Sequence, residues 1–407
     1  MVSLDEARAY VLERVAPLDV VRAHPRELSG CILAEAVTAP DDVPPFDNTA
    51  VDGFAVRAAD TANAPVVLRI DGTLLAGADP AGVVVEPGGA VRIMTGAPMP
   101  AGADAVVMIE RTSDADHAAV HIEAGVGAGD NVRRAGDDVR AGAEVAAVGA
   151  EITPAVAGVL ASVGAVDVAV HRRPRVGVLS TGDELVEGAA PLRPGQIRDS
   201  NRHVLLPLLA LAGCDGVDLG LIPDDEAAIV AAVEGAATHC DALLTSGGVS
   251  MGDVDLVKVV LDRLGEMRWM QIDIKPAKPF AFGLVTLGDR SLPVFGLPGN
   301  PVSSIVSFEL LARPALRRML GHRVLDRPRV LATAAEPLRR RPDGKTHFVR
   351  VAASFGADGR VHVRLAGGQG SHQLTALAAA NALAVRPDGE GVPAGGDVDT
   401  ILLSLTA

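Results

Sequence analysis

The feature that most constrains this chain is a regular alternation of short apolar runs and helical patterns that begins near residue 173. Runs such as RVGVLST, DALLT and LPVFGLP have the length and composition of buried strands, and amphipathic stretches separate them. Strands that alternate with helices form a mostly parallel sheet with helices on both faces. We therefore predict a doubly wound α/β domain over residues 173–322.

The rest of the chain has a different sequence pattern. Its 407 residues are too many for one ordinary core. Short Val-rich runs cut by Gly and Pro turns predict a β-rich inserted domain over 26–144 and a small β domain over 323–407. Helical patterns on either side of the insertion predict a small linking helical domain, built from 1–25 together with 145–172. Its second helix is predicted to start with Thr153 as N-cap and Pro154 as first residue.

Composition and charge exclude some functions. The formal net charge of 37 − 51 = −14 argues against general binding of nucleic acid, which needs a positive field. Aromatic residues make up only 2% of the chain, which disfavours base-stacking platforms. A basic segment, LRRRPDGKTHFVR (338–350), still leaves room for a local pocket that binds a small anion.

The cysteines and the apolar runs indicate a cytoplasmic protein. The three cysteines are far apart and lack metal-ligand spacing, so we interpret them as buried small residues in a reducing compartment. The amphipathic N-terminus does not resemble a signal peptide. The most apolar long run, 152–170, contains Pro154 and Asp167, which predicts a buried helix and strand and no membrane contact.

Four loops of the α/β domain follow predicted strands. They are STGDEL (180–185), PDDE (223–226), TSGGVSMGDVD (245–255) and GLPGNPVSS (296–304). Ligands of such sheets bind beyond the carboxyl ends of the strands, so we expect these loops to form one site.

The third loop, residues 245–255, has the composition of a phosphate-binding loop. Gly247 and Gly248 lack a Cβ, which allows backbone N–H groups to approach an anion, and Ser246 and Ser250 add hydroxyl donors. A plain strand-to-helix turn is the alternative. Four similar loops in one domain favour the anion site.

Two acids follow these glycines at once. Asp253 lies where a helical period begins, which predicts an N-cap. Asp255 lies in the first turn, where the helix dipole alone would explain it. A carboxylate beside a phosphate loop is also how Mg²⁺ is held, and Asp224, Asp183 and Glu184 are candidates for the same shell.

Two further segments suit an oxyanion. Lys275 and Lys278 stand between prolines in IKPAKPFAFG (274–283), which predicts a stiff extended loop that holds two ammonium groups; solvated surface lysines are the alternative. Ser303 and Ser304 lie at the start of a helix predicted over 301–321, where N–H groups bind anions, although capping would also explain them.

The β-rich segment contains three polar stretches. PPFDNTAVDGFAV (44–56) carries Asp47, Asn48 and Asp52, a second stretch is centred on Thr95-Gly96, and GDNVRRAGDD (129–138) contains two arginines. Their composition is typical of turns, and they share no periodicity.

Nine segments occur along the chain in this order: PPFDNTAVDGFAVR, IMTGAPMPAGADAVVMIE, GDNVRRAGDDV, STGDEL, GQIRDSNR, TSGGVSMGDVD, IKPAKPFAFG, FGLPGNPVSS and QGSHQLTALAAANAL. In this order they resemble the molybdopterin molybdenumtransferases, which are the bacterial MoeA proteins and the E domain of gephyrin. The resemblance runs from about residue 3 to the C-terminus. Departures are small: DGFA replaces the frequent DGYA, and VDG the frequent MDG.

The resemblance implies an elongated homodimer of four-domain subunits. Such proteins insert molybdenum from molybdate into adenylylated molybdopterin and release AMP, with Mg²⁺ or a similar divalent ion. Attack of a molybdate oxygen on the phosphoryl group would release the AMP. The α/β domain, of the molybdopterin-binding type, would hold the pterin nucleotide. Protein partners would be the molybdopterin adenylyltransferase and the recipient apo-molybdoenzymes.

The resemblance also assigns residues. Asp52 and Thr95 would belong to a wall of the site supplied by the partner subunit. Metal ligands would be Asp255, Asp224 and Glu184, and the catalytic set would be Asp255, Glu184, Lys275 and Lys278. Residues linked to the oxyanion would be Lys275, Lys278, Pro279, Ser303, Arg350 and Ser371. Further substrate contacts would come from the loop residues Thr181, Gly182, Ser246, Gly247, Gly248, Ser250, Pro298, Asn300 and Pro301.

Two other functions, adenylyl transfer to molybdopterin and binding as a scaffold, are the alternatives. The related adenylyltransferase is normally little more than the α/β domain, so the inserted and C-terminal domains argue against it. A gephyrin-like binding scaffold has little support, because the chain lacks the fused partner domain and the long linker.

Overall fold

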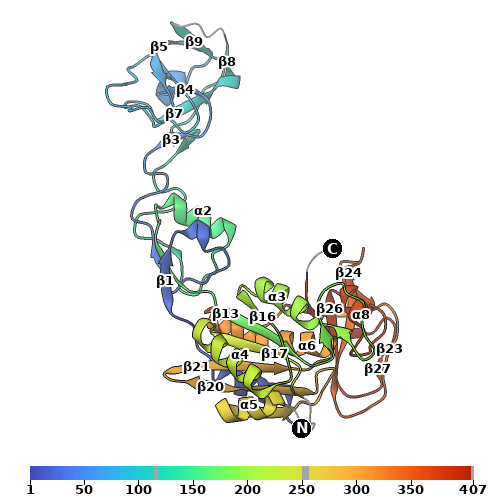
Figure 1. Ribbon diagram of the computed structural model, residues 1–407. Helices are drawn as coiled ribbons and strands as arrows, with labels where there is room; N and C mark the ends of the chain where they lie inside the picture. The colour runs from blue at the N-terminus through green and yellow to red at the C-terminus, as the bar shows by residue number, and fades with distance from the viewer. Residues whose placement is uncertain (114–117, 250–255, 405–407) are drawn as a thin grey trace. The chain divides into compact units, whose positions relative to one another are not determined.

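The computed structural model describes residues 1–113, 118–249 and 256–404 (Figure 1). The chain divides into two compact units. The first contains Met1–Val21, Gly30–Ala34 and Val170–Ala407, and the second contains Arg22–Ser29 and Glu35–Ala169. The predicted four-domain division is finer than these units and stays a prediction.

The first unit contains a six-stranded mixed sheet of order β16-β13-β17-β21-β20-β18. Four neighbouring strands are parallel: β16 (Asp215–Ile222), β13 (Arg175–Thr181), β17 (Ala242–Ser246) and β21 (Arg290–Leu297). Two antiparallel strands complete the edge, β20 (Pro279–Leu287) and β18 (Gly265–Gln271). The predicted mostly parallel α/β sheet is confirmed.

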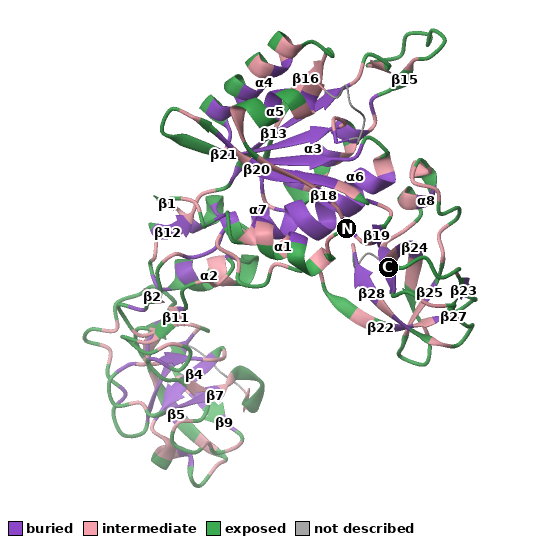
Figure 2. Ribbon diagram, turned by 90° about the horizontal axis from the view of Figure 1, so that it is seen from below, coloured by how far each residue is buried: buried purple, intermediate pink, exposed green. Residues whose placement is uncertain are grey.

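Helices cover both faces of this sheet (Figure 2). One face packs against α4 (Glu226–His239) and α5 (Leu256–Leu264). The other packs against α1 (Leu4–Leu12), α3 (Asn201–Leu211), α6 (Pro301–Ser307) and α7 (Arg313–Met319). Adjacent residues such as Val178 and Leu179 belong to opposite cores, as strand alternation requires.

One predicted helix is interrupted. The helical pattern over 301–321 divides into α6, a π-helical turn (η4, Phe308–Ala312) and α7. Pro314, at the start of α7, has no backbone N–H to donate to the preceding turn, so the hydrogen-bond pattern shifts there.

A second sheet of the first unit closes into a small barrel. Its order is β24-β25-β22-β28-β26, and a further pairing between β24 and β26 closes it. The strands are β22 (Arg329–Ala334), β24 (Thr346–Phe355), β25 (Val361–Leu365), β26 (Ala382–Arg386) and β28 (Asp397–Leu402). Aliphatic residues such as Val349, Val363 and Ala384 fill its core. Short β19 (Ile274–Lys275) pairs with β24 and links the α/β segment to the barrel.

The second unit is β-rich, as predicted for the insertion. Its six-stranded sheet has the order β7-β4-β6-β5-β9-β8. The strands are β4 (Gly53–Val56), β5 (Val66–Leu74), β6 (Gly89–Ile93), β7 (Ala105–Met108), β8 (Thr112–Ser113) and β9 (Ala119–Ile122). Helix α2 (Pro154–Ser162) begins as its sequence predicts: the Thr153 hydroxyl accepts a hydrogen bond from the Val156 N–H.

No helix in the described ranges is long and apolar enough to cross a membrane.

Candidate functional site

The structure brings the predicted loops of the α/β sheet together at its carboxyl edge. The Asn201 side-chain N–H₂ group donates to the Ser246 hydroxyl, which ends β17, and to the Gly299 carbonyl beyond β21, each at 2.7 Å. The Gly247 N–H donates to the Leu297 carbonyl at 3.1 Å. One polar side chain at the start of α3 therefore joins two of the predicted loops.

The two glycines of the third loop are required by geometry. Gly247 has φ +95° and Gly248 has φ +71°, both in the left-handed region. A Cβ on Gly247 would lie 3.0 Å from the Thr181 carbonyl oxygen. A Cβ on Gly248 would lie 2.5 Å from the Val257 Cβ. Gly248 therefore leaves no space for a side chain, and at Gly247 a Cβ would be in tight contact with the Thr181 carbonyl.

Asn201 belongs to a buried network of polar side chains that the sequence pattern did not predict. The Asp199 carboxylate accepts hydrogen bonds from the Ser180 hydroxyl at 3.2 Å, the Asn201 N–H at 3.1 Å and the Arg202 Nε at 3.0 Å. Arg202 also reaches Asp218 at 2.5 Å and Glu187 at 2.8 Å. The signal in the sequence was the polar run RDSNR at a strand-to-helix junction.

The predicted acidic residues lie beside the ends of β13 and β16. The Asp183 carboxylate accepts a hydrogen bond from the Asp224 N–H at 3.3 Å, so the first two loops are adjacent. The Glu184 carboxylate packs over Gly182, whose Cβ, if present, would lie 2.5 Å from Glu184 Oε2.

The metal prediction is only partly covered by the structure. Within residues 1–113, 118–249 and 256–404, no group of three or more His, Cys, Asp or Glu side chains is arranged to hold a metal ion. The predicted ligand Asp255, the predicted helix cap Asp253 and the predicted anion contact Ser250 lie outside the described residues.

The fourth loop meets the C-terminal barrel. Asn300 is the N-cap of α6 but makes no side-chain capping hydrogen bond, and Pro301 is its first residue. The Val302 N–H donates to the carbonyl of Ser371, which belongs to a loop of the barrel, at 3.0 Å. Ser303 is buried beside this contact, and Pro298 precedes it. The structure thus brings Ser371 to the start of the helix that contains Ser303.

The two predicted lysines are both exposed. Lys275 lies on β19, opposite His347 of β24. The Lys278 carbonyl accepts from the Ile272 N–H at 2.8 Å, and Pro279 opens β20. The stiff extended loop predicted over 274–283 is therefore a short turn between two strands, and a proline at a strand's first residue is compatible with this.

Arg350 is a buried cation without a carboxylate partner in the described part of the chain. It is 0% exposed, and its Nη2 donates to the carbonyls of Gly368 at 2.6 Å and Gly370 at 3.1 Å. Its Nε and Nη1 atoms are buried with no partner among the described residues. Burial lowers the pKa of this guanidinium. It lies against the loop that contains Ser371.

In the second unit, the three polar stretches come together. The Asp52 carboxylate accepts from both the N–H and the hydroxyl of Thr95, each at 2.7 Å. The Thr95 backbone and side-chain hydrogen bonds lower the pKa of Asp52. Asp47 pairs with Arg134 at 2.6 Å. The interpretation of these stretches as separate turns missed this convergence.

The fold and these loops agree with the comparisons to known proteins. Residues 2–164 match the MoeA N-terminal region (domain I and II), 177–318 a probable molybdopterin binding domain, and 332–403 the MoeA C-terminal region (domain IV). The crystal structure of the molybdopterin biosynthesis MoeA protein from Pyrococcus horikoshii OT3 is similar, with a TM-score of 0.80, 30% identity and coverage of 99% of this chain and 100% of that one.

Curated relatives agree over nearly the whole length. The chain is 38% identical to a molybdopterin molybdenumtransferase of Haemophilus influenzae, over 98% of both chains. It is 36% identical to molybdopterin molybdenumtransferase 2 of Mycobacterium tuberculosis, over 95% of this chain and 96% of that one. The chain therefore belongs to the molybdopterin molybdenumtransferase (MoeA) family.

Proposed function

We propose that this protein inserts molybdenum from molybdate into adenylylated molybdopterin and releases AMP. The observation that carries the proposal is the 38% identity to a molybdopterin molybdenumtransferase over 98% of both chains. The matches to the MoeA N-terminal and C-terminal regions, outside the α/β domain, disfavour the alternative of a bare adenylyltransferase.

The α/β edge would bind the phosphate end of the pterin nucleotide. Gly247 and Gly248 give this loop a left-handed backbone, which can turn successive N–H groups toward an anion, and Ser246 is held by Asn201 at 2.7 Å. Thr181, Gly182, Pro298, Asn300 and Pro301 belong to the same loops and would complete the contacts, with Ser250.

The oxyanion would be bound where the barrel meets α6. Arg350 supports this role, because it is buried and has two nitrogen atoms without partners among the described residues. A guanidinium is well suited to a tetrahedral oxyanion. Ser303 and Ser371 lie on the two sides of this junction, and Lys275, Lys278 and Pro279 come from the neighbouring strands β19 and β20 and the turn between them.

A divalent ion, Mg²⁺ or one like it, would be held by Glu184, Asp224 and Asp255. Glu184 and Asp224 follow the neighbouring parallel strands β13 and β16, which suits a hard cation that prefers carboxylate oxygens. Such an ion would neutralise negative charge at the phosphate.

We also propose a cytoplasmic homodimer in which Asp52 and Thr95 reach the partner's site. The protein partners would be the adenylyltransferase that supplies the nucleotide and the apo-molybdoenzymes that receive the product. Asp52 and Thr95 are exposed at one end of their sheet and hydrogen-bonded to each other, which suits a preformed contact surface.

The test of the reaction is AMP release from adenylylated molybdopterin by the purified protein. Release that requires molybdate and a divalent ion is expected. A protein that instead forms the adenylylated pterin from ATP and molybdopterin, and shows no molybdate-dependent release of AMP, would contradict the proposal.

Mixing two inactive variants tests the shared site. In a heterodimer of Asp52→Ala with Arg350→Met, one site would receive both intact residues if they come from different subunits. Random exchange should then restore about a quarter of the parent activity. If both residues serve the same subunit, the mixture should stay as inactive as its components.

A further inference from the structure

The mouth of the C-terminal barrel contains a cationic cleft whose lining does not include Arg350. The cleft has a volume of about 460 Å³. Its charged lining consists of Lys275, Arg339, Arg340, Arg341 and Arg386 against one carboxylate among the described residues, that of Asp343. Such an excess of positive charge in a concave site favours an anionic ligand.

Arg386 occupies the end of the barrel interior. Along β26, Ala382 and Ala384 face the apolar core of the barrel. Arg386 is two residues further along the strand and therefore lies on the same side of it. On the paired strand β24, Val349 and Val351 face this core, whereas Arg350 lies between them on the other face. The two buried arginines therefore point to different places.

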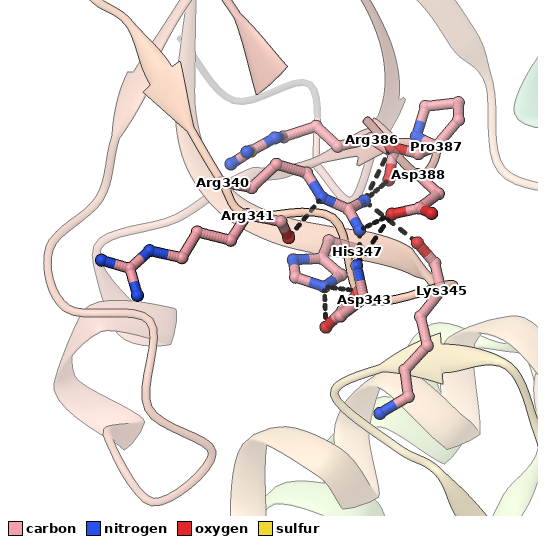
Figure 3. Close-up of polar contacts among 8 residues, drawn as sticks. All are labelled: Arg340, Arg341, Asp343, Lys345, His347, Arg386, Pro387 and Asp388. Atoms are coloured by element: carbon pink, nitrogen blue, oxygen red, sulfur yellow. Dashed lines mark hydrogen bonds and ion pairs between the residues drawn. The ribbon is translucent and has the colours of Figure 1, made fainter. Parts of the chain in front are cut away.

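The Asp343 carboxylate of the cleft and the nearby Asp388 carboxylate already have partners. Arg340 donates to Asp343 and Asp388 at 2.7 Å each, and to the carbonyls of Lys345, Arg386 and Pro387 (Figure 3). His347 Nε2 also contacts Asp343, at 3.0 Å. These contacts hold the segment that carries Arg339 and Arg341 against the end of β26.

The Arg386 guanidinium is left without such partners. The residue is 4% exposed, and its Nε and Nη2 atoms are buried without a hydrogen-bond partner among the described residues. No dashed contact reaches its guanidinium in Figure 3. Burial, and then the nearby Arg340, lower the pKa of Arg386. A buried charge without a partner is costly, so a ligand that supplies negative charge would relieve the cost.

We propose that the mouth of the barrel binds a tetrahedral oxyanion of the phosphate type, held by the Arg386 guanidinium and flanked by Arg339 and Arg341. A guanidinium offers parallel N–H donors that match two oxygens of such an anion. This site goes beyond the proposed molybdenum transfer, and Lys275 is common to its lining and to the oxyanion site proposed above. The oxyanion would be either a free inorganic ion or the phosphate of a larger ester.

The test is calorimetric titration of the full-length protein with inorganic phosphate, molybdate and phenyl phosphate. Arg386→Leu is compared with Arg364→Leu, which removes the same charge from an exposed position on β25, outside the lining of the cleft. Each variant is also made in an Arg350→Met background, so that binding at Arg350 is not counted.

Arg386→Leu should weaken phosphate binding by at least about tenfold, whereas Arg364→Leu should stay within about twofold of the parent. In the Arg350→Met background, phosphate should raise the melting temperature of the protein with Arg386 intact but not that of the protein with Arg386→Leu. In phosphate-free buffer, Arg386→Leu should melt no lower than the parent, because it removes an unpaired buried charge.

In the Arg350→Met background, equal phosphate affinity with and without Arg386→Leu would overturn the proposal, as would no binding of any probe by the protein with Arg386 intact. If Arg386→Leu does not fold, Arg386→Lys replaces it; this variant keeps the charge but loses the paired donors and should bind phosphate more weakly, and unchanged affinity would again overturn the site. Binding of the inorganic anions alone indicates that the natural ligand is a free oxyanion, and equal binding of phenyl phosphate indicates a phosphate ester.

The release of AMP is assayed separately, so failure of this site and failure of the transfer reaction are distinguishable.

Discussion

Two buried arginines of the first unit have opposite surroundings. The Arg202 side chain, on α3, is 3% exposed and contacts three carboxylates, those of Asp199, Asp218 and Glu187. Arg350, on β24, is 0% exposed, and its contacts are two backbone carbonyls. Both lie next to loops of the candidate site.

The difference separates a structural charge from one available to a ligand. Breaking a buried ion pair is costly because it leaves an uncompensated charge, so Arg202 holds Asp199 and, through it, Asn201 in place. The charge of Arg350 has no such counter-ion in the described part of the chain. We therefore expect substitutions of the two arginines to separate stability from oxyanion binding.

The largest loss of stability is expected for Arg202→Met. It leaves the buried Asp199 carboxylate without its cation and should lower the free energy of unfolding by about 3–5 kcal/mol. The midpoint of urea unfolding measures this. The double variant with Asp199→Ala is the control, and it should lose less than the sum of the two single changes. Simple additivity would show that the ion pair is not the cause.

A smaller loss of stability is expected for Gly248→Ala, in the loop that Asn201 contacts through Ser246. The left-handed backbone costs about 1–2 kcal/mol for alanine, and crowding against Val257 about 1–3 kcal/mol more. Gly235→Ala on α4 is the matched control, because its Cβ would meet nothing within 4 Å. That variant should gain about 0.5–1 kcal/mol. Similar urea midpoints for the two variants would contradict the steric account.

Arg350→Met should change stability by less than about 1 kcal/mol, because the lost hydrogen bonds are offset by removal of an unpaired buried charge. Molybdate-dependent release of AMP should nevertheless fall by orders of magnitude. Thermal melts and turnover are measured on one preparation. A variant that unfolds as easily as Arg202→Met would remove the contrast between the two arginines.

The smallest effect is a pH dependence at Asp218. Burial tends to raise the pKa of this carboxyl, but the hydrogen bonds from Arg202 and Gly220 lower it overall. A lowered pKa in the folded state gives stability that is present above the unfolded value, about 3.9, and is lost as pH falls through the folded value. The melting temperatures of the parent and Asp218→Asn should therefore differ at pH 7 and converge as the pH falls through the lowered folded-state pKa of Asp218. A constant difference across this range would contradict the linkage.

The sequence predicted what depends on local pattern. Strand–helix alternation predicted the α/β sheet, and Thr153-Pro154 predicted the start of α2. The π-helical turn at 308–312 was missed, because apolar periodicity does not reveal a local shift of hydrogen bonds. The four loops were predicted to meet because parallel strands end at one edge.

What the sequence could not predict depends on contacts between distant segments. Asn201 joins Ser246 and Gly299, and nothing local to residue 201 identifies those partners. The polar stretches around Asp52 and Thr95 have turn composition, so only the pairing of β4 with β6 shows that they meet. The unpaired charges of Arg350 and Arg386 are likewise invisible until burial and partners are known.

The most direct test of the account is the binding of AMP and of molybdate, titrated separately, to Asn201→Ala and Arg350→Met. We propose that the α/β loops bind the nucleotide phosphate and that Arg350 of the barrel binds the oxyanion. Asn201→Ala should weaken the binding of AMP at least about tenfold, because Ser246 and Gly299 lose their shared donor. The same variant should leave the affinity for molybdate nearly unchanged. Arg350→Met should do the reverse. Equal weakening of both ligands by each variant would contradict the division of the site between the sheet and the barrel.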